Sequence, residues 1–241
     1  MKQPRQDIHN SEVPVLCQSC DARHRGICGA LKANELIAFA QHTRVVALEA
    51  GDVLVEENGQ IDCYANVMRG VVKLSKTLSD GRQQIVGLQF APDFVGRLHV
   101  RESPTRAEAS SRVELCRISR TALHRILTDN PALEARLLRQ ALRDVDEARE
   151  WMLALGRKTA SEKVASFLLM IAGHIDPTVK VGDGHSFDLP LTRTEIGDFL
   201  GLTIGTVSRE LTALRRSRII EIESHRRVTI VDHAALRAHS G

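Results

Sequence analysis

The sequence predicts an α+β protein: an N-terminal antiparallel β-roll, one long helix, and a C-terminal domain of short helices with a β-hairpin. Three observations support this prediction. Short β-type segments separated by turns fill residues 44–118, apolar residues recur at helical spacing over 130–155, and two short helices flank a glycine turn within 191–222. A chain of 241 residues that is 43% hydrophobic is long enough for two domains with sizeable cores.

The N-terminal segment holds three of the five cysteines. Residues 1–16 are polar, contain two prolines and are expected to form a loose arm, and "CQSCDARHRGIC" follows with Cys17, Cys20 and Cys28 in C-x2-C-x7-C spacing. The chain has no secretory signal and no run near the roughly 18 apolar residues of a membrane span, so we expect a cytoplasmic protein without membrane contact. In a reducing compartment, clustered cysteines are more often metal ligands or redox groups than disulfides.

A short helix and a set of strands follow the cysteines. "KANELIAFAQH" predicts a helix with Asn34 as its N-cap and Leu36, Ile37 and Phe39 facing inward. Beyond it, Asp80-Gly81 separates two β-type runs and indicates a hairpin, because glycine readily takes the positive φ of a tight turn. Many short strands without intervening helices favour an antiparallel roll.

Residues 130–155 are predicted to form one long helix. Its apolar residues are spaced 3, 4, 3, 4 and 3 apart, which makes a narrow seam flanked by Arg, Asp and Glu. A narrow seam suits a helix partner better than a sheet, so we interpret this segment as a dimer helix. The alternative is a helix that packs on its own domain. The seam consists of Leu138, Ala141, Val145, Ala148, Met152 and Leu155.

The C-terminal region predicts a helix-turn-helix. Thr159 and Glu162 form a capping box that begins one helix, and the Gly- and Pro-containing loop "DPTVKVGDGHS" ends it. A second capping box, Thr192 with Glu195, begins a helix of about 193–200, and Gly201 supplies the turn. In the helix that Thr203 caps, one face has Ile204, Val207, Leu211 and Leu214, and the other Ser208, Arg209, Thr212 and Arg216. Such a helix can enter a major groove.

The charge pattern agrees with a local nucleic-acid surface. Lys plus Arg exceed Asp plus Glu by 33 to 30, so the net charge of +3 does not by itself indicate DNA binding. Between Arg209 and Arg227, however, six Arg stand against three Glu. "RIIEIES" and "RRVTIV" predict a β-hairpin wing whose Arg226 and Arg227 could contact the DNA backbone. The alternative is a solvated charged face on an unrelated helical hairpin.

With these motifs the chain resembles, over nearly its whole length, the CRP/FNR superfamily of bacterial transcription regulators, and within it the FNR-type oxygen sensors. The resemblance rests on the order of the elements and on "PDFVG", "GRKTASEKVASFL" and "GLTIGTVSREL". It implies a cysteine arm over 1–30, a β-roll like a cyclic-nucleotide-binding jelly roll over 31–129, a dimerisation helix over 130–156 and a winged helix over 157–241.

The resemblance also implies a cofactor. FNR-type proteins hold a [4Fe-4S] cluster with three N-terminal cysteines and one in the β-roll. Carried over to this sequence, the ligands are Cys17, Cys20, Cys28 and Cys116, the last in "RVELCRIS". Thiolates suit iron-sulfur clusters. The expected function is oxygen-controlled transcription regulation, with whether it activates or represses left open.

The expected partners are double-stranded DNA, RNA polymerase and a second copy of the chain, and the homodimer would bind a palindromic operator. The residues expected at the DNA are Thr203, Gly205, Thr206, Ser208, Arg209, Thr212 and Arg216.

Three positions depart from the family pattern. Seven residues, where the best-known members have five, separate Cys20 from Cys28, which leaves the oxygen sensitivity open. Gly205 stands where the family usually has a base-reading Glu; it leaves operator preference open and weakens the helix by roughly 1 kcal/mol relative to Ala. Cys63 has no family counterpart, and we interpret it as a small buried residue, or otherwise as a substitute ligand.

Four other readings remain. The four sulfurs could hold zinc, since C-x2-C also suits a tetrahedral site. A cyclic-nucleotide regulator is disfavoured because "PDFVGRLHVRESPTRAEA" lacks the Gly-Glu pair and the Arg-Ser/Thr that hold the phosphate. A redox enzyme or electron carrier would leave the winged helix unexplained, and the chain has none of the common catalytic motifs, so we expect no enzyme activity. A regulator that senses redox through bare thiols is the remaining reading.

Overall fold

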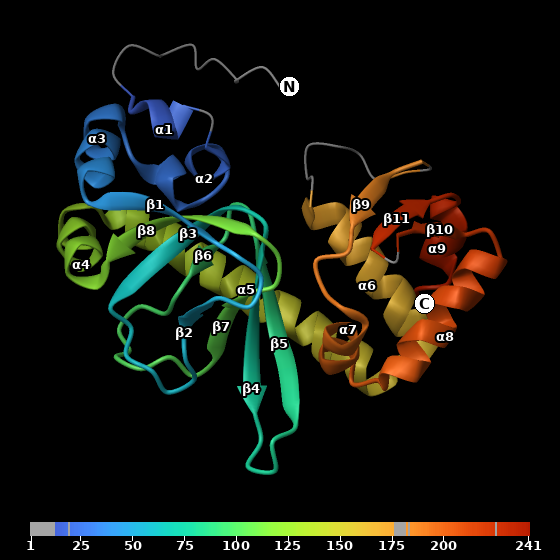
Figure 1. Cartoon of the computed structure of the whole chain (residues 1–241). Coiled ribbons are helices and arrows are strands. Elements are labelled where there is room, and N and C mark those ends of the chain that lie inside the picture. The colour runs from blue at the N-terminus through green and yellow to red at the C-terminus, as the bar shows by residue number, and fades with distance from the viewer. Residues whose placement is uncertain (1–12, 19, 176–181, 183, 225) are drawn as a thin grey trace. The chain divides into compact units, whose positions relative to one another are not determined.

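The computed structural model describes residues 13–18, 20–175, 182, 184–224 and 226–241 and divides into two compact units (Figure 1). The first unit comprises Met1–Ser75 and Leu88–Val145, and the second comprises Lys76–Gly87 and Asp146–Gly241. Most of the expected N-terminal arm, and most of the loop expected after residue 175, lie outside the described residues.

Two antiparallel four-stranded sheets build the β-roll, and the α+β prediction is confirmed. The first sheet has the order β1-β8-β3-β6, with strands Thr43–Leu48, Val113–Ser119, Cys63–Arg69 and Phe94–Val95. The second has the order β2-β7-β4-β5, with strands Val53–Val55, Arg106–Ala109, Val71–Thr77 and Gln83–Phe90. The turn at Asp80-Gly81 joins β4 to β5 as expected, with a hydrogen bond from the Leu78 amide to the Arg82 carbonyl. Small and branched side chains fill a core in the roll: Ala65, Val67, Val72, Val95, Ala107, Ala109, Val113 and Leu115.

Short helices pack on the first sheet (Figure 1). They are α1 (Val15–Gln18), α2 (Asp21–His24), the 3₁₀ helix η1 (Ile27–Ala30), α3 (Ala33–Gln41) and α4 (Arg120–Asp129). Helix α3 is capped by Lys32, not Asn34 as predicted, because the Lys32 amide donates to the carboxylate of Glu35. A second core joins these helices to the sheet; its largest fully buried members are Ile27, Leu36, Phe39, Tyr64, Ile118, Leu123 and Leu133.

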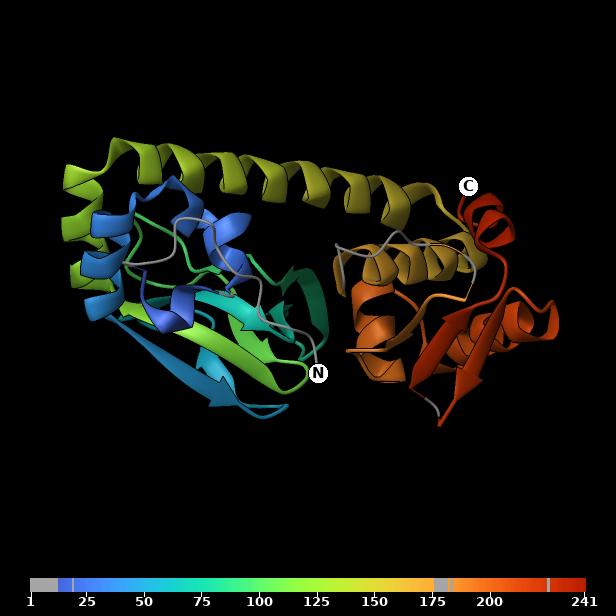
Figure 2. The same cartoon turned by 90° about the horizontal axis from the view of Figure 1, so that it is seen from above.

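Helix α5 (Pro131–Arg157) is the long helix that the sequence predicts, and Figure 2 shows it as one uninterrupted rod. Its residues belong to both units. Leu133 and Leu137 lie buried in the core of the first unit, whereas Leu138, Leu142 and Val145 are exposed. The helix therefore has one face in its own domain and a separate apolar face that the described part of the chain leaves open.

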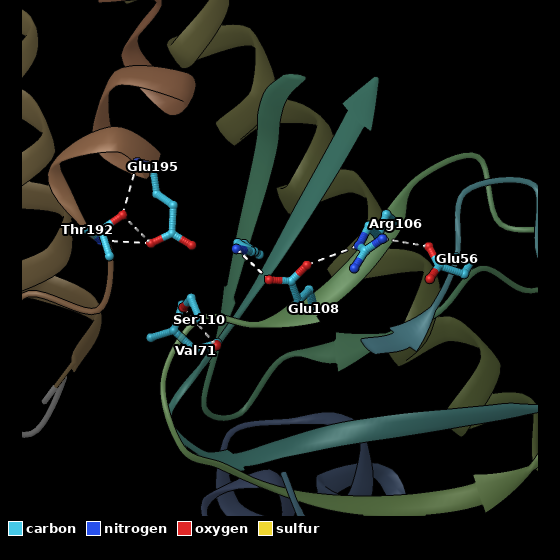
Figure 3. Close-up of polar contacts among 8 residues, drawn as sticks. Glu56, Val71, Arg106, Glu108, Ser110, Thr192 and Glu195 are labelled. Carbon is cyan, nitrogen blue, oxygen red and sulfur yellow. Dashed lines mark hydrogen bonds and ion pairs between the residues drawn. The ribbon is translucent and has the colours of Figure 1, made fainter. Parts of the chain in front are cut away.

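The described part of the second unit contains four more helices and a three-stranded sheet of order β10-β11-β9. The helices are α6 (Ala160–Ile175), α7 (Arg193–Leu200), α8 (Ile204–Arg216) and α9 (His233–Ala238), and the strands are β9 (Ser186–Asp188), β10 (Ile220–Glu223) and β11 (Arg227–Ile230). Both capping boxes are confirmed. In the second, the Thr192 amide donates to Glu195 at 2.8 Å and the Glu195 amide to the Thr192 hydroxyl at 3.3 Å (Figure 3). No helix in the described part of the chain is long and apolar enough to cross a membrane.

Gly70 marks the point at which the chain passes from β3 in one sheet to β4 in the other. Its φ is +80°, and a Cβ there would collide with the Arg112 carbonyl and the Val113 side chain. Gly81 has a similar φ of +86°, but a Cβ there would stand in open space among the described residues. Both positions need the left-handed region, and only Gly70 also needs the missing side chain.

We expect Gly70→Ala to destabilise the protein more than Gly81→Ala. The left-handed backbone alone costs roughly 1–2 kcal/mol for a non-glycine residue, and this cost applies to both variants. At Gly70 the neighbouring strand must also shift. Urea unfolding of both variants measures the difference, and equal losses in the free energy of unfolding would show that the close approach at Gly70 carries no weight.

Candidate functional site

Three of the cysteines lie in or directly beside the short helices that precede the β-roll. Cys17 is in α1, Cys20 directly precedes α2, and Cys28 is in η1. Backbone hydrogen bonds join successive turns, from the Cys20 amide to the Cys17 carbonyl at 3.4 Å and from the Arg23 amide to the Cys20 carbonyl at 3.1 Å. The seven residues between Cys20 and Cys28 are thus largely taken up by α2. None of α1, α2 and η1 was predicted, because helices of four residues are too short to show a helical period in the sequence.

Cys116 lies on β8, far from the others in sequence. In the sheet it pairs with Val45 of β1 on one side and with Asn66 of β3 on the other. The side-chain amide of Asn66, a buried residue, lies 3.8 Å from the Cys28 sulfur, at the limit of an N–H···S contact. The Asn66 Oδ1 is buried and has no hydrogen-bond partner among the described residues. Asn66 therefore links Cys28 to the strand beside Cys116.

The thiols act on one another electrostatically. Burial raises the pKa of Cys28 well above its usual range, and the thiols of Cys116, Cys20 and Cys17 raise it further. Burial, followed by Cys20 and Cys116, raises the pKa of Cys17 to about 11, against a smaller lowering by Arg23. Burial also raises the pKa of Cys116, opposed by a hydrogen bond from Thr43 and assisted by Cys20. The thiol site, defined as Cys17, Cys20, Cys28 and Cys116, therefore gathers in one region.

The donor set of the thiol site fits an iron-sulfur cluster. Four thiolates are the ligands that a [4Fe-4S] cluster takes. In the part of the chain that the structure describes, no group of three or more His, Cys, Asp or Glu side chains is arranged around a single metal ion. A four-iron cluster is larger than one ion, so its ligands stand farther apart. The raised pKa values mean that any metal must displace protons from these thiols.

Cys63 differs from the sequence prediction. It lies on β3 as expected, but its side chain is partly exposed and not buried. The guanidinium of Arg117, on the adjacent strand β8, donates a hydrogen bond to its sulfur. A strand end beside a long Arg side chain gives the thiol a polar partner, and the sequence contains no sign of that pairing.

Helices α7 and α8 form the predicted helix-turn-helix. Gly201 makes the turn with a φ of +64°, and the Thr203 hydroxyl caps α8 by accepting from the Thr206 amide at 3.1 Å. Val207, Leu211 and Leu214 are buried, whereas Ile204, predicted to face inward, is 55% exposed because it occupies the first turn beyond the core.

The residues expected at the DNA share the open face of α8. Ser208, Arg209 and Arg216 are exposed, as are Thr203 and Gly205. The Thr206 hydroxyl joins Thr203 at 2.9 Å and accepts from the Arg209 guanidinium at 3.1 Å. Thr212 donates to the Ser208 carbonyl at 2.8 Å. The hydroxyls thus steady the guanidinium at the helix N-terminus, where it can reach base edges.

Most of the seam on α5 is open. Leu138, Val145 and Met152 are 61%, 45% and 71% exposed, and Ala141 and Ala148 are exposed as well. Leu155 is half-buried. Two exposed apolar residues beside the seam, Leu142 and Leu153, were not included in the sequence-based set. They widen the apolar surface available to a partner.

The second sheet of the roll carries a chain of ion pairs. Arg106 contacts Glu56 and Glu108, both at 3.0 Å, and Glu108 also accepts from the buried Lys73 at 2.7 Å (Figure 3). Two cations and two anions balance one another here. Arg106, one of the three arginines in the stretch where cyclic-nucleotide regulators hold the phosphate, is therefore already engaged by carboxylates.

Comparison with known proteins matches each of the two domains to a known domain family. A Crp-like helix-turn-helix domain matches residues 162–239, and a cyclic nucleotide-binding domain matches residues 45–130. A "Probable transcriptional activator" of Rhizobium leguminosarum bv. viciae is 49% identical over 95% of this chain and 94% of its own. "Transcriptional activator protein FnrL" of Cereibacter sphaeroides is 38% identical over 95% of both chains.

A solved structure agrees with these relatives. FixK2 from Bradyrhizobium japonicum superposes with a TM-score of 0.74 at 28% sequence identity, covering 83% of this chain and 98% of its own. The helix-turn-helix, the β-roll and the extent of these matches lead to one conclusion: the chain belongs to the CRP/FNR family of transcription regulators.

Proposed function

We propose that this transcription regulator holds a [4Fe-4S] cluster at the thiol site and, when oxygen is low, binds a palindromic operator as a homodimer. The observation that carries the proposal is that the side-chain amide of Asn66 reaches the Cys28 sulfur while Asn66 pairs in the sheet with Cys116, a residue some ninety positions from Cys28 in sequence. The names of the two bacterial relatives, both activators, favour activation of transcription.

When bound, the cluster supplies an oxygen-labile link between the cysteine segment (residues 17–28) and Cys116. The protein's own part is to present four sulfurs from two regions of the chain. The short helices fix three of them, and β8 fixes the fourth between its two neighbouring strands. Burial limits the access of water to Cys28 in particular.

The open face of α8 supports the DNA half of the proposal. A helix N-terminus with exposed hydroxyls and Arg209 suits base edges and phosphates, and Arg216 follows two turns later. Gly205 presents no side chain, so we expect it to contribute no hydrogen bond to a base. With two copies related by a two-fold axis, two such helices would meet half-sites about one helical turn apart.

The competing proposal is a regulator whose thiols respond to redox without iron. One experiment separates the two: the visible absorption, iron and sulfide content of anaerobically purified protein, before and after a pulse of air. We expect a broad band that changes in air, and about four irons per chain. A colourless protein with zinc or no metal would contradict the cluster and leave the DNA-binding half standing.

Substitution of single cysteines tests the ligands of the proposed cluster. Replacing Cys17, Cys20, Cys28 or Cys116 singly with Ala should abolish the visible band and most of the bound iron, because each supplies one of four ligands. Cys63→Ala is the matched control and should retain both, since Cys63 bonds to Arg117. Iron loss in Cys63→Ala with retention in Cys116→Ala would reassign the fourth ligand.

Substitution of Arg209 tests the proposed contact between α8 and the DNA bases. Arg209→Ala should weaken binding to an operator selected by the wild-type protein by about 1–3 kcal/mol, because a base contact is lost. Arg237→Ala removes the same charge from an exposed position on α9 and should change affinity little. Fluorescence anisotropy at one fixed salt concentration measures both, and equal losses would indicate a general charge effect.

A charge placed in the seam on α5 tests the proposed dimer interface. Ala148 is exposed on α5, and Ala148→Asp would place two like charges together at the dimer axis. We expect the anaerobic dimer to weaken by about tenfold or more. Ala234→Asp, at an exposed position on α9, serves as the control. Sedimentation velocity reports the dissociation constant, and unchanged sedimentation of Ala148→Asp would refute the seam as the interface.

A further inference from the structure

Arg136, on the second turn of α5, binds the backbone of the cysteine segment. Its Nε donates to the Gly26 carbonyl at 3.0 Å and its Nη2 to the Arg25 carbonyl at 2.8 Å. These two carbonyls immediately precede η1, the helix that carries Cys28. A guanidinium is a planar, rigid fork of donors, so two bonds to consecutive carbonyls fix both the position and the direction of the segment.

The segment lies against its neighbours with no room to spare. A Cβ on Gly26 would stand 2.8 Å from the Pro92 carbonyl and 2.9 Å from Ala22. A Cβ on Gly29 would stand 2.8 Å from the Arg23 carbonyl and 3.5 Å from Nη2 of Arg136. Glycine at these two positions lets the backbone come close enough for the guanidinium to reach its acceptors.

Apolar contacts accompany the two hydrogen bonds. Ile27 and Cys28 share a core with Leu133 and Leu137, the α5 residues on either side of Arg136 in the sequence. The seam residues Leu138 and Val145 are exposed on another face of the same helix. One end of α5 thus carries both the contact to the cysteine segment and the beginning of the seam.

We propose that Arg136 transmits the state of the thiol site to the seam on α5. This inference rests on the proposed function. Asn66, which pairs with Cys116 in the sheet, contacts the Cys28 sulfur of the segment, whereas Arg136 attaches the segment to the helix. When the segment is held at the thiol site, the carbonyls of Arg25 and Gly26 stay in place and anchor α5 in the orientation that pairs with a second copy.

When the segment is released from the thiol site, the two hydrogen bonds to the guanidinium open more often, and α5 is anchored for a smaller share of the time. The coupling is reciprocal: whatever free energy the held segment adds to dimerisation, dimerisation returns to the holding of the segment. Arg136 is a positioning residue in this scheme, because it contacts neither a cysteine sulfur nor, by this proposal, the second copy.

The test compares the dimer dissociation constant of the full-length protein with and without the cluster. Protein reconstituted anaerobically with ferrous iron and sulfide is compared, by sedimentation velocity, with the same protein after chelation. For the wild type we expect the cluster to tighten the dimer about fivefold or more, and for Arg136→Gln we expect a ratio within about twofold of one. Arg125→Gln, which removes the same charge from an exposed position on α4, should retain the wild-type ratio.

Hydrogen exchange gives a readout that does not require the cluster. In chelated protein, the amides of Gly29 and Leu31 donate within η1 and should exchange faster in Arg136→Gln than in Arg125→Gln. Arg136→Lys retains one cationic donor and should give an intermediate ratio of dissociation constants, which serves if Arg136→Gln folds poorly or holds little iron.

The outcomes are distinct. A wild-type ratio in Arg136→Gln or Arg136→Lys, with exchange at η1 unchanged, would overturn the role of Arg136 and leave the proposed function intact. A wild-type protein whose dimer affinity is the same with and without the cluster would overturn oxygen control through dimerisation, and the role of Arg136 with it.

Discussion

The burial of Ile27 and Cys28 in the core of the first unit is the constraint on which the rest of the arrangement depends. The same core receives Tyr64 and Ile118 from the sheet and Leu133 and Leu137 from α5. A segment of short turns has little stability of its own, since helices of four residues cannot offset the cost of nucleation. Its place is set by what it packs against. Sheet, cysteine segment and long helix therefore share one apolar centre, and a change in any of them reaches the others.

Helix α5 has one apolar face packed in the first unit and a second apolar face that the described residues leave open, which the proposed pairing with a second copy requires. Residues near its N-terminal end alternate between the core of the first unit and an exposed apolar surface, and the polar side chains between them include Arg136. A helix that only packed on its own domain would not need the exposed residues, and one that only paired with a second copy would not need the buried ones. Packing of α5 on its own domain and pairing of α5 with a second copy are therefore compatible.

Much of the fold could be predicted because its signals are local. Turn residues such as Asp80-Gly81, capping pairs such as Thr192 with Glu195, and the period of α5 act over a few positions, and the structure agrees with each. The prediction that Ile204 faces inward was wrong, because helical periodicity does not show where a core ends. The proximity of Cys116 to the N-terminal cysteines is a matter of tertiary packing, and only family resemblance suggested it. Arg136 carried no signal at all, since its partners are backbone carbonyls that any residue would supply.

The protonated condition of the buried thiols has a consequence for the protein when it carries no cofactor. Alkylating agents and peroxides attack the thiolate and not the thiol, and oxidation beyond the sulfenic acid is irreversible for most proteins. Because the pKa of Cys28 stands well above its usual range and that of Cys17 is about 11, very little thiolate exists at neutral pH at either residue. Cys17 and Cys28 are therefore expected to react slowly with such agents when no cofactor is bound.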